Sequence, residues 1–428
     1  MKEAVVSVLI SALAVLPSVP GEGHHELPPN VGQGRNGGAE TIDSLRIPTT
    51  WPWAKRIAES FILRHPGSVT YDSGSPNPRW NYEQGLMLEA LHQMWLLTYD
   101  RRYFDFLKGN IDHYVEDSGS IRTYNYEDFN LDNIAVGRAL LMLHEATGVK
   151  KYKYAADTLR LQLKNQPRTR EGGFWHKKIY PYQMWLDGLF MAEPFYAWYA
   201  VKFKEAEALD GIVDQFVFIH NHTRDPRTGL LYHGWDESKQ QPWANAETGC
   251  SPNFWGRAMG WYAMALVDVL DFLPKNYSRG HELVSILRDL SASLLKFQDK
   301  KTHLWYQVVD QGAREGNYFE ASASCMLAYA FAKGANKGYL GRKYFQTAKE
   351  TFRGIVQNLV TVDASGFVDL HHTCQGAGLG GKPYRDGSYE YYISEPQRTN
   401  DMKGYGSFLL AAIELQKGDR RTKGVNDK

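Results

Sequence analysis

The sequence predicts an all-α protein, an (α/α)6 barrel in which six inner helices are surrounded by six outer helices. Three observations lead to this fold class. Helical stretches come in pairs from about residue 50 onward, the second member of each pair carries few charges, and the loop before each second member is long. A helix without a polar face must be enclosed by other helices, so the second members are expected to form the inner ring.

The helical stretches are recognised by their apolar periodicity and by the residues that interrupt it. The first stretch opens after Thr50, with Pro52 in its first turn. In chain order, the outer and inner members of the pairs are expected at 51–65 and 82–99, 101–115 and 132–145, 151–163 and 185–203, 205–220 and 255–273, 281–297 and 320–333, and 342–360 and 402–415.

The loops differ at the two ends of the predicted barrel. The leading loops, which run into the inner helices, are long and hold short, strand-like aromatic pieces at 173–176, 229–233, 304–306 and 366–369. The loops that leave the inner helices are short. All long loops therefore gather at one end, where a binding or active site is expected. A helical-repeat solenoid is the alternative, and the irregular repeat length and the aromatic loops argue against it.

A single domain is expected over 50–418, because no linker rich in Pro, Ser or Gly divides the middle of the chain. The apolar run at 4–16 is too short to span a bilayer and suits a secretory signal, so 1–20 is expected to be a signal peptide of a secreted or periplasmic protein. Since the cleavage site is poor, the alternative is a buried N-terminal helix in a cytoplasmic protein. Residues 21–49 are expected to form an irregular lead-in, and 419–428 a polar tail.

Composition narrows the range of ligands. The formal net charge of +1 gives no electrostatic reason to expect nucleic acid or an anionic membrane as a partner. Cys250, Cys325 and Cys374 lack the spacing of zinc ligands, so no metal site is expected, and an odd count argues against a disulfide framework but leaves one bridge open. Aromatic residues make up 13% of the chain and suit sugar rings as well as a core.

Asp187 is the first candidate for chemistry. It follows Trp185 at the start of a strongly apolar helix, where unpaired N–H groups and the positive end of the helix dipole favour a carboxylate. A neighbouring indole would raise the pKa of the carboxyl group, and the N–H donors would lower it. An isolated Asp at such a position is usually a plain N-cap, but the arrangement recurs at other inner helices.

Asp132 opens the preceding inner helix, so its carboxylate and that of Asp187 are candidates to face one cavity. Paired carboxylates in an aromatic cleft are typical of glycosidic-bond chemistry, in which one acts as an acid and the other orients or activates water. A ring of helix N-termini also favours an anionic ligand, such as a carboxylated sugar. For Asp132 alone, the alternative is an N-cap.

Further candidates lie in the leading loops and at the start of the fourth inner helix. His176 and His233 would bond a sugar hydroxyl or an aspartate, with an ordinary surface position as the alternative. Trp255, Arg257 and Trp261 do not share one helical face. Arg257 would hold a carboxylate, and the alternative is an ion pair with an acid in a loop.

Five segments together resemble a known group of enzymes. They are WNYEQG at 80–85, GFWHK at 173–177 followed by MWLDGL at 184–189, WGRAMGW at 255–261, NYFEASAS at 317–324 and NDMKG at 400–404. Over about 50–416 the chain resembles the unsaturated glucuronyl and galacturonyl hydrolases. It is most similar to glycoside hydrolase family 105, the unsaturated rhamnogalacturonyl hydrolases, which are related to family 88.

The resemblance implies roles for particular residues. Asp187 would be the proton donor and general base, and Asp132 the second carboxylate. The residues that would line the sugar site are Tyr82, His176, Trp185, His233, Trp255, Arg257 and Trp261.

The resemblance also implies the substrate and the reaction. The substrate would be an oligosaccharide of the pectin or rhamnogalacturonan type, generated by a lyase and ending in a uronic acid with a C4=C5 double bond. Asp187 would protonate C4, water would add at C5, and collapse of the hemiketal would release the next sugar. No metal or organic cofactor would be needed.

Three alternatives remain open on the sequence. An inverting glycosidase would need a base that holds water on the far side of the anomeric carbon. A polysaccharide lyase would use a base beside a neutralising cation, which Tyr82 and Arg257 would imitate. A non-catalytic sugar-binding protein would keep the tryptophans but would have no need of Asp187.

Overall fold

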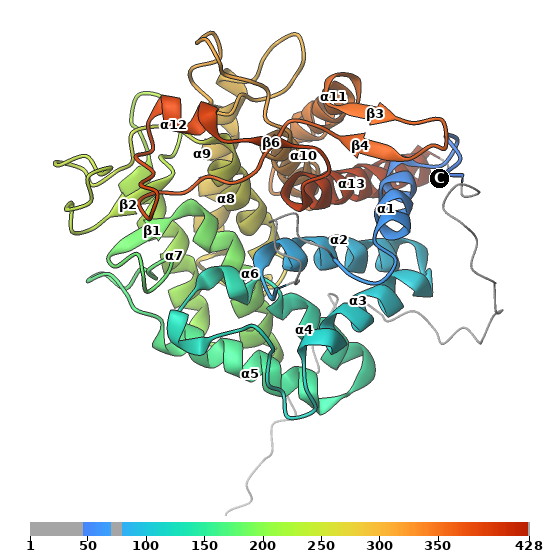
Figure 1. The fold of residues 1–428 in the computed structure, drawn as a ribbon, viewed down its shortest axis with the longest axis horizontal. Helices are drawn as coiled ribbons and strands as arrows, with labels where there is room; N and C mark the ends of the chain where they lie inside the picture. The colour runs from blue at the N-terminus through green and yellow to red at the C-terminus, as the bar shows by residue number, and fades with distance from the viewer. Residues whose placement is uncertain (1–45, 70–78, 427–428) are drawn as a thin grey trace, which may run out of the picture. The chain divides into compact units, whose positions relative to one another are not determined.

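The computed structural model describes residues 46–69 and 79–426, and in this part of the chain the predicted barrel is confirmed (Figure 1). The inner helices are α2 (Tyr82–Thr98), α4 (Gly137–Thr147), α6 (Leu186–Lys202), α8 (Gly256–Val269), α10 (Ala321–Asn336) and α13 (Met402–Asn426). Each packs against the next in this order, and α13 packs against α2 to close the ring.

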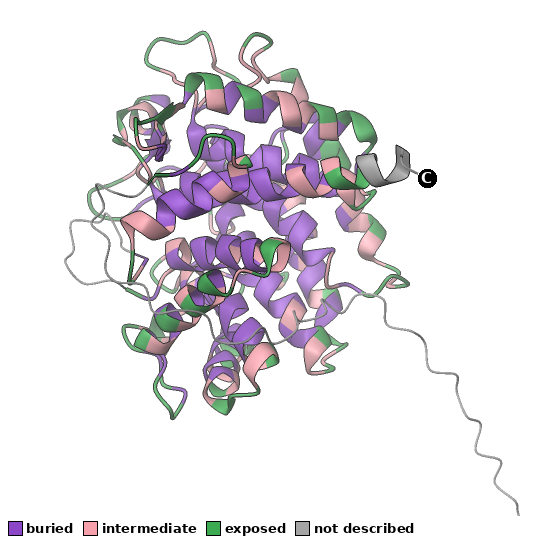
Figure 2. Ribbon diagram, turned by 90° about the vertical axis from the view of Figure 1, so that its right-hand side faces the viewer, coloured by how far each residue is buried: buried purple, intermediate pink, exposed green. Residues whose placement is uncertain are grey.

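The outer helices alternate with the inner ones along the chain. They are α1 (Trp53–Arg64), α3 (Arg101–Tyr114), α5 (Lys150–Asn165), α7 (Ala208–Thr223), α9 (Gly280–Lys296) and α11 (Arg342–Asn358). Figure 2 shows that the buried residues concentrate on the enclosed helices. In α10, for example, every residue from Ala321 to Gly334 is buried, as expected for a helix without a polar face.

Local sequence explains several helix ends. Asn81 and Asp100 are N-caps whose side chains accept hydrogen bonds from the N–H groups of the second helical residues of α2 and α3, at 2.6 and 3.0 Å. Gly148 ends α4 with a φ of 69°, a left-handed conformation that glycine adopts without strain. Asp100 and Gly148 lie at the end of the barrel with the short loops, whereas Asn81 begins an inner helix at the end of the leading loops.

A buried ion-pair cluster lies where the ring closes. Lys403 of α13 contacts the carboxylate of Glu83 in α2, and its Nζ lies 2.8 Å from Asp401 Oδ1. Lys403 and Asp401 are buried. The first and the last inner helices are therefore joined by charge as well as by apolar packing.

The second inner helix begins later than predicted. Residues Leu131–Ile134 form a 3-10 turn, η3, because the Asn130 side chain accepts a hydrogen bond from the N–H of Asp132 at 3.0 Å. The α-helix α4 starts only at Gly137. The short helices η2 (Tyr126–Asp128) and α12 (Tyr389–Ser394) were not predicted, and α13 continues to Asn426 through much of the expected polar tail.

Three two-stranded sheets form in or beside the leading loops. They pair β1 (Gln183–Trp185) with β2 (Gly234–Asp236), β3 (Val360–Val362) with β4 (Val368–Leu370), and β5 (Thr373–Cys374) with β6 (Gln397–Arg398), all antiparallel. Of the expected strand-like pieces, only 366–369 overlaps a strand. The other three contribute isolated bridges, such as Arg168 with Phe174.

Several expectations concern the rest of the chain. The expected signal peptide and most of the lead-in lie outside the described residues. Among the helices that are described, none is both long and apolar enough to cross a membrane.

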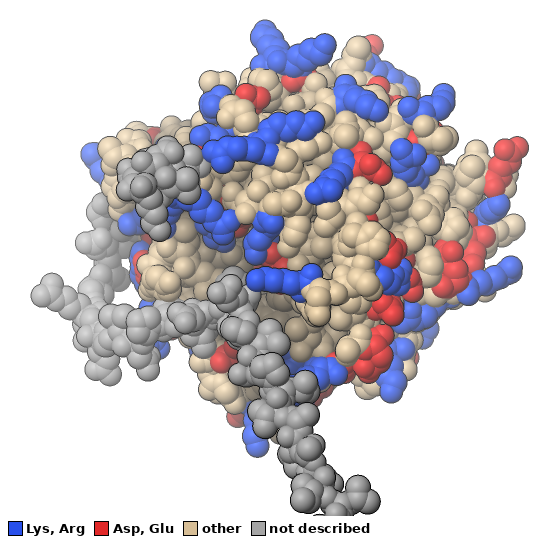
Figure 3. All heavy atoms as spheres, turned by 180° about the vertical axis from the view of Figure 1, so that it is seen from behind, with Lys and Arg blue, Asp and Glu red and all other residues tan. Residues whose placement is uncertain are grey.

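The three cysteines are buried, and none of them forms a disulfide bond. Lys and Arg side chains share the face seen in Figure 3 with Asp and Glu side chains.

Candidate active site

Asp187 lies in the first turn of α6, beside His233. Its carboxylate Oδ2 is 3.2 Å from His233 Nε2. Both atoms are buried, and neither has a well-aligned hydrogen-bond partner among the described residues. Because α6 has no side-chain N-cap, Asp187 does not serve as a plain cap. Catalytic contacts are often loose without substrate and tighten when it binds. The loose contact with His233 is therefore compatible with a role of Asp187 as an acid or a base.

His233 is held in place by its backbone and by its ring. Its carbonyl accepts a hydrogen bond from Leu186 N at 3.1 Å, which fixes the leading loop of α8 to the start of α6. Its Nδ1 lies 2.8 Å from the hydroxyl of Tyr392. If that hydroxyl donates to Nδ1, then Nε2–H faces an ionised Asp187. If Nδ1–H donates instead, the Nε2 lone pair faces a protonated Asp187. The contact therefore suits both protonation states of the carboxyl group.

Asp132 lies in the turn η3 and is bound by two basic side chains. Lys177 donates from Nζ to its Oδ2 at 2.5 Å, and His176 Nε2 lies 3.4 Å from its Oδ1. Burial alone would raise the pKa of Asp132, but Lys177 and His176 hold it well below the usual range. Asp132 is therefore ionised at neutral pH. It is not an N-cap, because Asn130 caps this turn.

Trp185 lies between the two histidines. Its indole stacks on His176 with ring centroids 4.6 Å apart and meets His233 edge-to-face at 5.4 Å. The β1–β2 pairing sets this arrangement, because Trp185 is opposite Gly234, the residue after His233. One buried indole therefore contacts both imidazoles that adjoin the two aspartates.

Close backbone approach also shapes the site. The carbonyl of His176 accepts a hydrogen bond from Leu131 N at 3.1 Å, which joins the leading loop of α6 to η3. A Cβ on Gly188 would lie 3.1 Å from His176 Nδ1 and 3.2 Å from a methyl carbon of Leu131. The absence of a side chain at Gly188 thus leaves the space that His176 occupies.

Trp255 and Trp261 are each only 1% exposed. Trp255 donates from Nε1 to the Gln307 side chain at 3.0 Å, and its ring lies 4.7 Å from that of His233. Trp261 packs against the half-buried Tyr82, with ring centroids 6.1 Å apart. Both tryptophans therefore support the walls of the site from behind.

Arg257 forms the ion pair that the sequence left open as an alternative. It is 1% exposed, and its Nη2 lies 3.1 Å from Glu320 Oε1. Its Nε donates to the hydroxyl of Ser322 at 2.6 Å, and Nη2 also donates to the carbonyl of Cys374. Burial alone would lower the pKa of Arg257, but Glu320 together with Cys374, Asp401 and Tyr82 raises it above its usual value. This geometry favours a structural role for Arg257.

The structure thus brings His233 into contact with both Asp187 and Trp255, and His176 into contact with Asp132, while Trp185 contacts both histidines. Sequence reasoning assigned no role to Lys177 or Tyr392. Lys177 directly follows the candidate residue His176 in the GFWHK segment, and this position beside a candidate could have identified it. Tyr392 lies in α12, far along the chain, and no sequence signal marked it. Within the described residues, no group of three or more His, Cys, Asp or Glu side chains is arranged to hold a metal ion.

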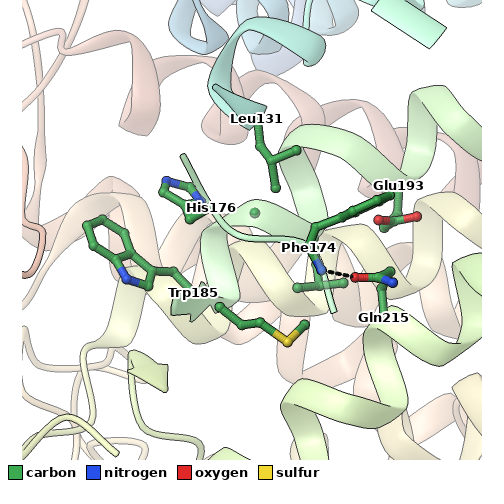
Figure 4. A pocket seen from close by; sticks show the side chains of 9 residues that line it. Leu131, Phe174, His176, Trp185, Glu193 and Gln215 are labelled. Carbon is green, nitrogen blue, oxygen red and sulfur yellow. Dashed lines mark hydrogen bonds between the residues drawn. The ribbon is translucent and has the colours of Figure 1, made fainter. Parts of the chain in front are cut away.

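A small cavity of about 10 Å³ lies behind His176 and Trp185 (Figure 4). It is lined by Leu131, Phe174, His176, Met184, Trp185, Gly188, Leu189, Glu193 and Gln215. A volume of this size admits about one water molecule, so it is no sugar site. Glu193 is 1% exposed, and its Oε2 has no hydrogen-bond partner in the described part of the chain. Burial raises the pKa of Glu193 well above its usual value, although Arg168 opposes this effect.

The buried Glu193 leads to a prediction about stability. The pKa of Glu193 is higher in the folded than in the unfolded protein, so its contribution is fully present below the unfolded pKa, about 4.3, and is lost as the pH rises. Glu193→Gln is therefore expected to be more stable than the wild type at neutral pH, with the difference shrinking toward pH 4. Urea unfolding across this range measures it. The exposed Glu207→Gln is the control, and identical pH dependence in both variants would contradict the prediction.

Comparisons with known proteins agree with these features. The sequence profile of Glycosyl Hydrolase Family 88 matches residues 53–418. A solved glycoside hydrolase from family 105 of C. acetobutylicum is 44% identical, with 86% of this chain and 100% of that chain covered and a TM-score of 0.82. The unsaturated rhamnogalacturonyl hydrolase YesR of Bacillus subtilis is 27% identical over 62% of this chain and 73% of its own.

A more distant relative shares the fold. The unsaturated glucuronyl hydrolase of Bacillus sp. GL1 has a TM-score of 0.61 at 14% identity, with 85% of this chain and 95% of that chain covered.

Proposed function

The chain belongs to Glycosyl Hydrolase Family 88, and from this premise we propose that it removes a terminal 4,5-unsaturated uronic acid from oligosaccharides made by a polysaccharide lyase. One observation carries the proposal. A buried carboxylate, Asp187, faces an imidazole that suits both of its protonation states, while a second carboxylate, Asp132, is kept ionised nearby. This pairing supplies a proton donor and a fixed negative charge in one site.

The proposed reaction is hydration of the double bond. Asp187 in its acid form donates a proton to C4, and positive charge develops at C5 and the ring oxygen. The ionised Asp187 then accepts a proton from water as the water oxygen bonds to C5. The hemiketal that results collapses as the bond between C5 and the ring oxygen breaks, C5 becomes a ketone and the ring oxygen takes the hydroxyl proton. The hemiacetal left at C1 then breaks its bond to the leaving sugar, which takes the proton of this hydroxyl and departs as an alcohol while C1 becomes an aldehyde. Protons balance, because water supplies the one that Asp187 lost.

Asp132 has a different proposed role. Its low pKa means that it has no proton to give at neutral pH. A fixed carboxylate near the ring stabilises the positive charge that develops when C4 is protonated, and it helps to hold the water. Lys177 and His176 fix the position of this carboxylate.

The proposed substrate class is of the pectin or rhamnogalacturonan type. The name of YesR, an unsaturated rhamnogalacturonyl hydrolase, supports this class. The half-buried Tyr180, which stacks on the buried Trp185, offers an aromatic ring for the apolar face of a sugar.

The alternatives fare less well against the geometry. A lyase would need a cation free to neutralise the substrate carboxylate, and Arg257 is buried against Glu320. A sugar-binding protein would present its tryptophans, whereas Trp255 and Trp261 are almost fully buried. An inverting glycosidase would release sugar and keep the double bond, so the absorbance of that bond distinguishes it from the proposed enzyme.

The test follows the ultraviolet absorbance of the conjugated double bond in lyase-generated disaccharides. The proposal expects the absorbance to fall as the sugars separate, with one deuterium incorporated at C4 in heavy water. Release of sugar at constant absorbance would indicate an ordinary glycosidase, and a rise on intact polysaccharide would indicate a lyase. Binding without either change would indicate a sugar-binding protein. Each of these three results contradicts the proposal.

Asp132→Asn is expected to lower kcat on the order of 10²-fold, the scale found when one preorganised electrostatic contact is removed from an active site. Initial rates on an unsaturated disaccharide measure the effect, together with the pH–rate profile. The control is Asp128→Asn, an exposed carboxylate of the same loop. An unchanged rate and profile in the Asp132 variant would reduce this residue to a structural partner of Lys177.

A further inference from the structure

A second pocket, of about 520 Å³, lies among the leading loops. It is lined by Ile179, Tyr180, Gln183, Gln241, Gly380, Gly381, Lys382, Pro383 and Arg385. Three loops that are distant in sequence contribute to it. Its volume lies within the range of about 300–1,000 Å³ that is usual for small-molecule sites, enough for one or two sugar residues.

The charged residues that line this pocket are all basic. Lys382 is exposed, and no ion pair involves it within the described residues. Arg385 is held in place, because its Nε donates to the carbonyl of Gly380 and its Nη2 to the hydroxyl of Tyr180, both at 2.8 Å. The lining contains no Asp or Glu. A ligand with negative charge therefore fits this pocket better than a neutral one.

Buried polar groups lie in the wall of the pocket and behind it. Gln183 is 2% exposed, and its Oε1 accepts a hydrogen bond from Trp185 Nε1 at 3.1 Å. The buried Trp243 has no partner for its Nε1 in the described part of the chain. A Cβ on Gly380 would lie 3.7 Å from this nitrogen and 3.8 Å from Gln241 Oε1. Gly380, which has a φ of 65°, leaves room beside Gln241 in the wall of the pocket, and the Trp243 indole lies behind it.

The pocket adjoins the wall of the proposed active site. The ring of Tyr180 stacks on Trp185 with centroids 4.8 Å apart, and Trp185 in turn stacks on His176. The Gln183 side chain bonds the same indole. An oligosaccharide whose unsaturated end lies near Asp187 thus has the second pocket within reach of its following sugars.

We propose that this pocket binds a sugar on the leaving-group side of the bond that is cleaved, and that it selects a uronic acid there. The proposal rests on the proposed function, which places the unsaturated end near Asp187. Lys382 and Arg385 would neutralise the uronate carboxylate, while Tyr180 and Pro383 would cover the apolar face of its ring.

The test uses two unsaturated oligosaccharides that differ only in whether the leaving-group uronate is a free acid or a methyl ester. With the wild type, the acid is expected to have the lower KM, and its advantage should decrease as salt is added. Lys382→Met should raise KM for the acid by about tenfold or more, the effect of one charged hydrogen bond, and leave the ester and kcat unchanged.

The control is Lys275→Met, an exposed lysine between α8 and α9, at the other end of the barrel. Equal KM values for acid and ester that Lys382→Met leaves unchanged would overturn the pocket proposal while the proposed function stands. If the wild type hydrates neither oligosaccharide nor a simple unsaturated disaccharide, the proposed function itself fails.

Discussion

Asp187→Asn is expected to lower kcat on unsaturated disaccharides by at least about 10²-fold and to leave the fold intact. The amide has nearly the shape of the carboxyl group and still contacts His233, but it has no proton of suitable acidity to give to C4. The residue caps nothing in α6, so little stability depends on its charge. Initial rates and the thermal unfolding midpoint measure the two halves of this expectation.

A matched control for this variant exists elsewhere in the barrel. Asp210 also lies in the first turn of a helix, the outer helix α7, where it contacts Tyr277 and Arg279. Asp210→Asn is expected to keep the wild-type rate. A near wild-type rate in Asp187→Asn would remove Asp187 from its proposed role. A low rate with a much lower unfolding midpoint would show that the residue acts through the fold.

Arg257→Met is expected to destabilise the protein by about 3–5 kcal/mol, the cost of leaving one member of a buried ion pair without its partner. Glu320 is fully buried and would lose its guanidinium, although it keeps hydrogen bonds from Ala323 N and Cys374 N. A loss of this size is a large part of a typical stability of about 5–15 kcal/mol. Urea unfolding of the two proteins measures it.

The double variant Arg257→Met/Glu320→Gln serves as the control, because it removes both charges. It is expected to recover much of the lost stability, which gives the coupling between the two residues. Kinetics provide the opposing result. If Arg257→Met is as stable as the wild type and raises KM for the unsaturated acid but not for its methyl ester, then Arg257 binds the substrate and the structural interpretation is wrong.

Local signals account for what the sequence predicted well. Apolar periodicity and caps such as Asn81 and Asp100 act within a few residues, so every expected helical stretch meets a helix of the structure. Where two local signals compete, the prediction shifts. Asn130 caps a tight turn and delays α4 to Gly137, although the apolar pattern begins earlier.

Pairings between distant segments could not be predicted in this way. His233 meets Tyr392 across 159 positions, and Arg257 meets Glu320 across 63. Only the order of helices in the ring brings these residues together. The position of Asp187 at a helix start was visible in the sequence, but the imidazole that contacts it depended on the pairing of β1 with β2.

The contact between α2 and α13, where the ring closes, has a consequence for biosynthesis. A ribosome adds about 5–20 residues per second, and about 300 residues separate the end of α2 from the start of α13, so tens of seconds pass between them. Throughout this interval the apolar side of α2 that α13 will cover has no partner, and Glu83 lacks Lys403. The nascent chain must therefore wait for its last helix before the ring can close, and it is during this wait that chaperones and proteases have access to its interior.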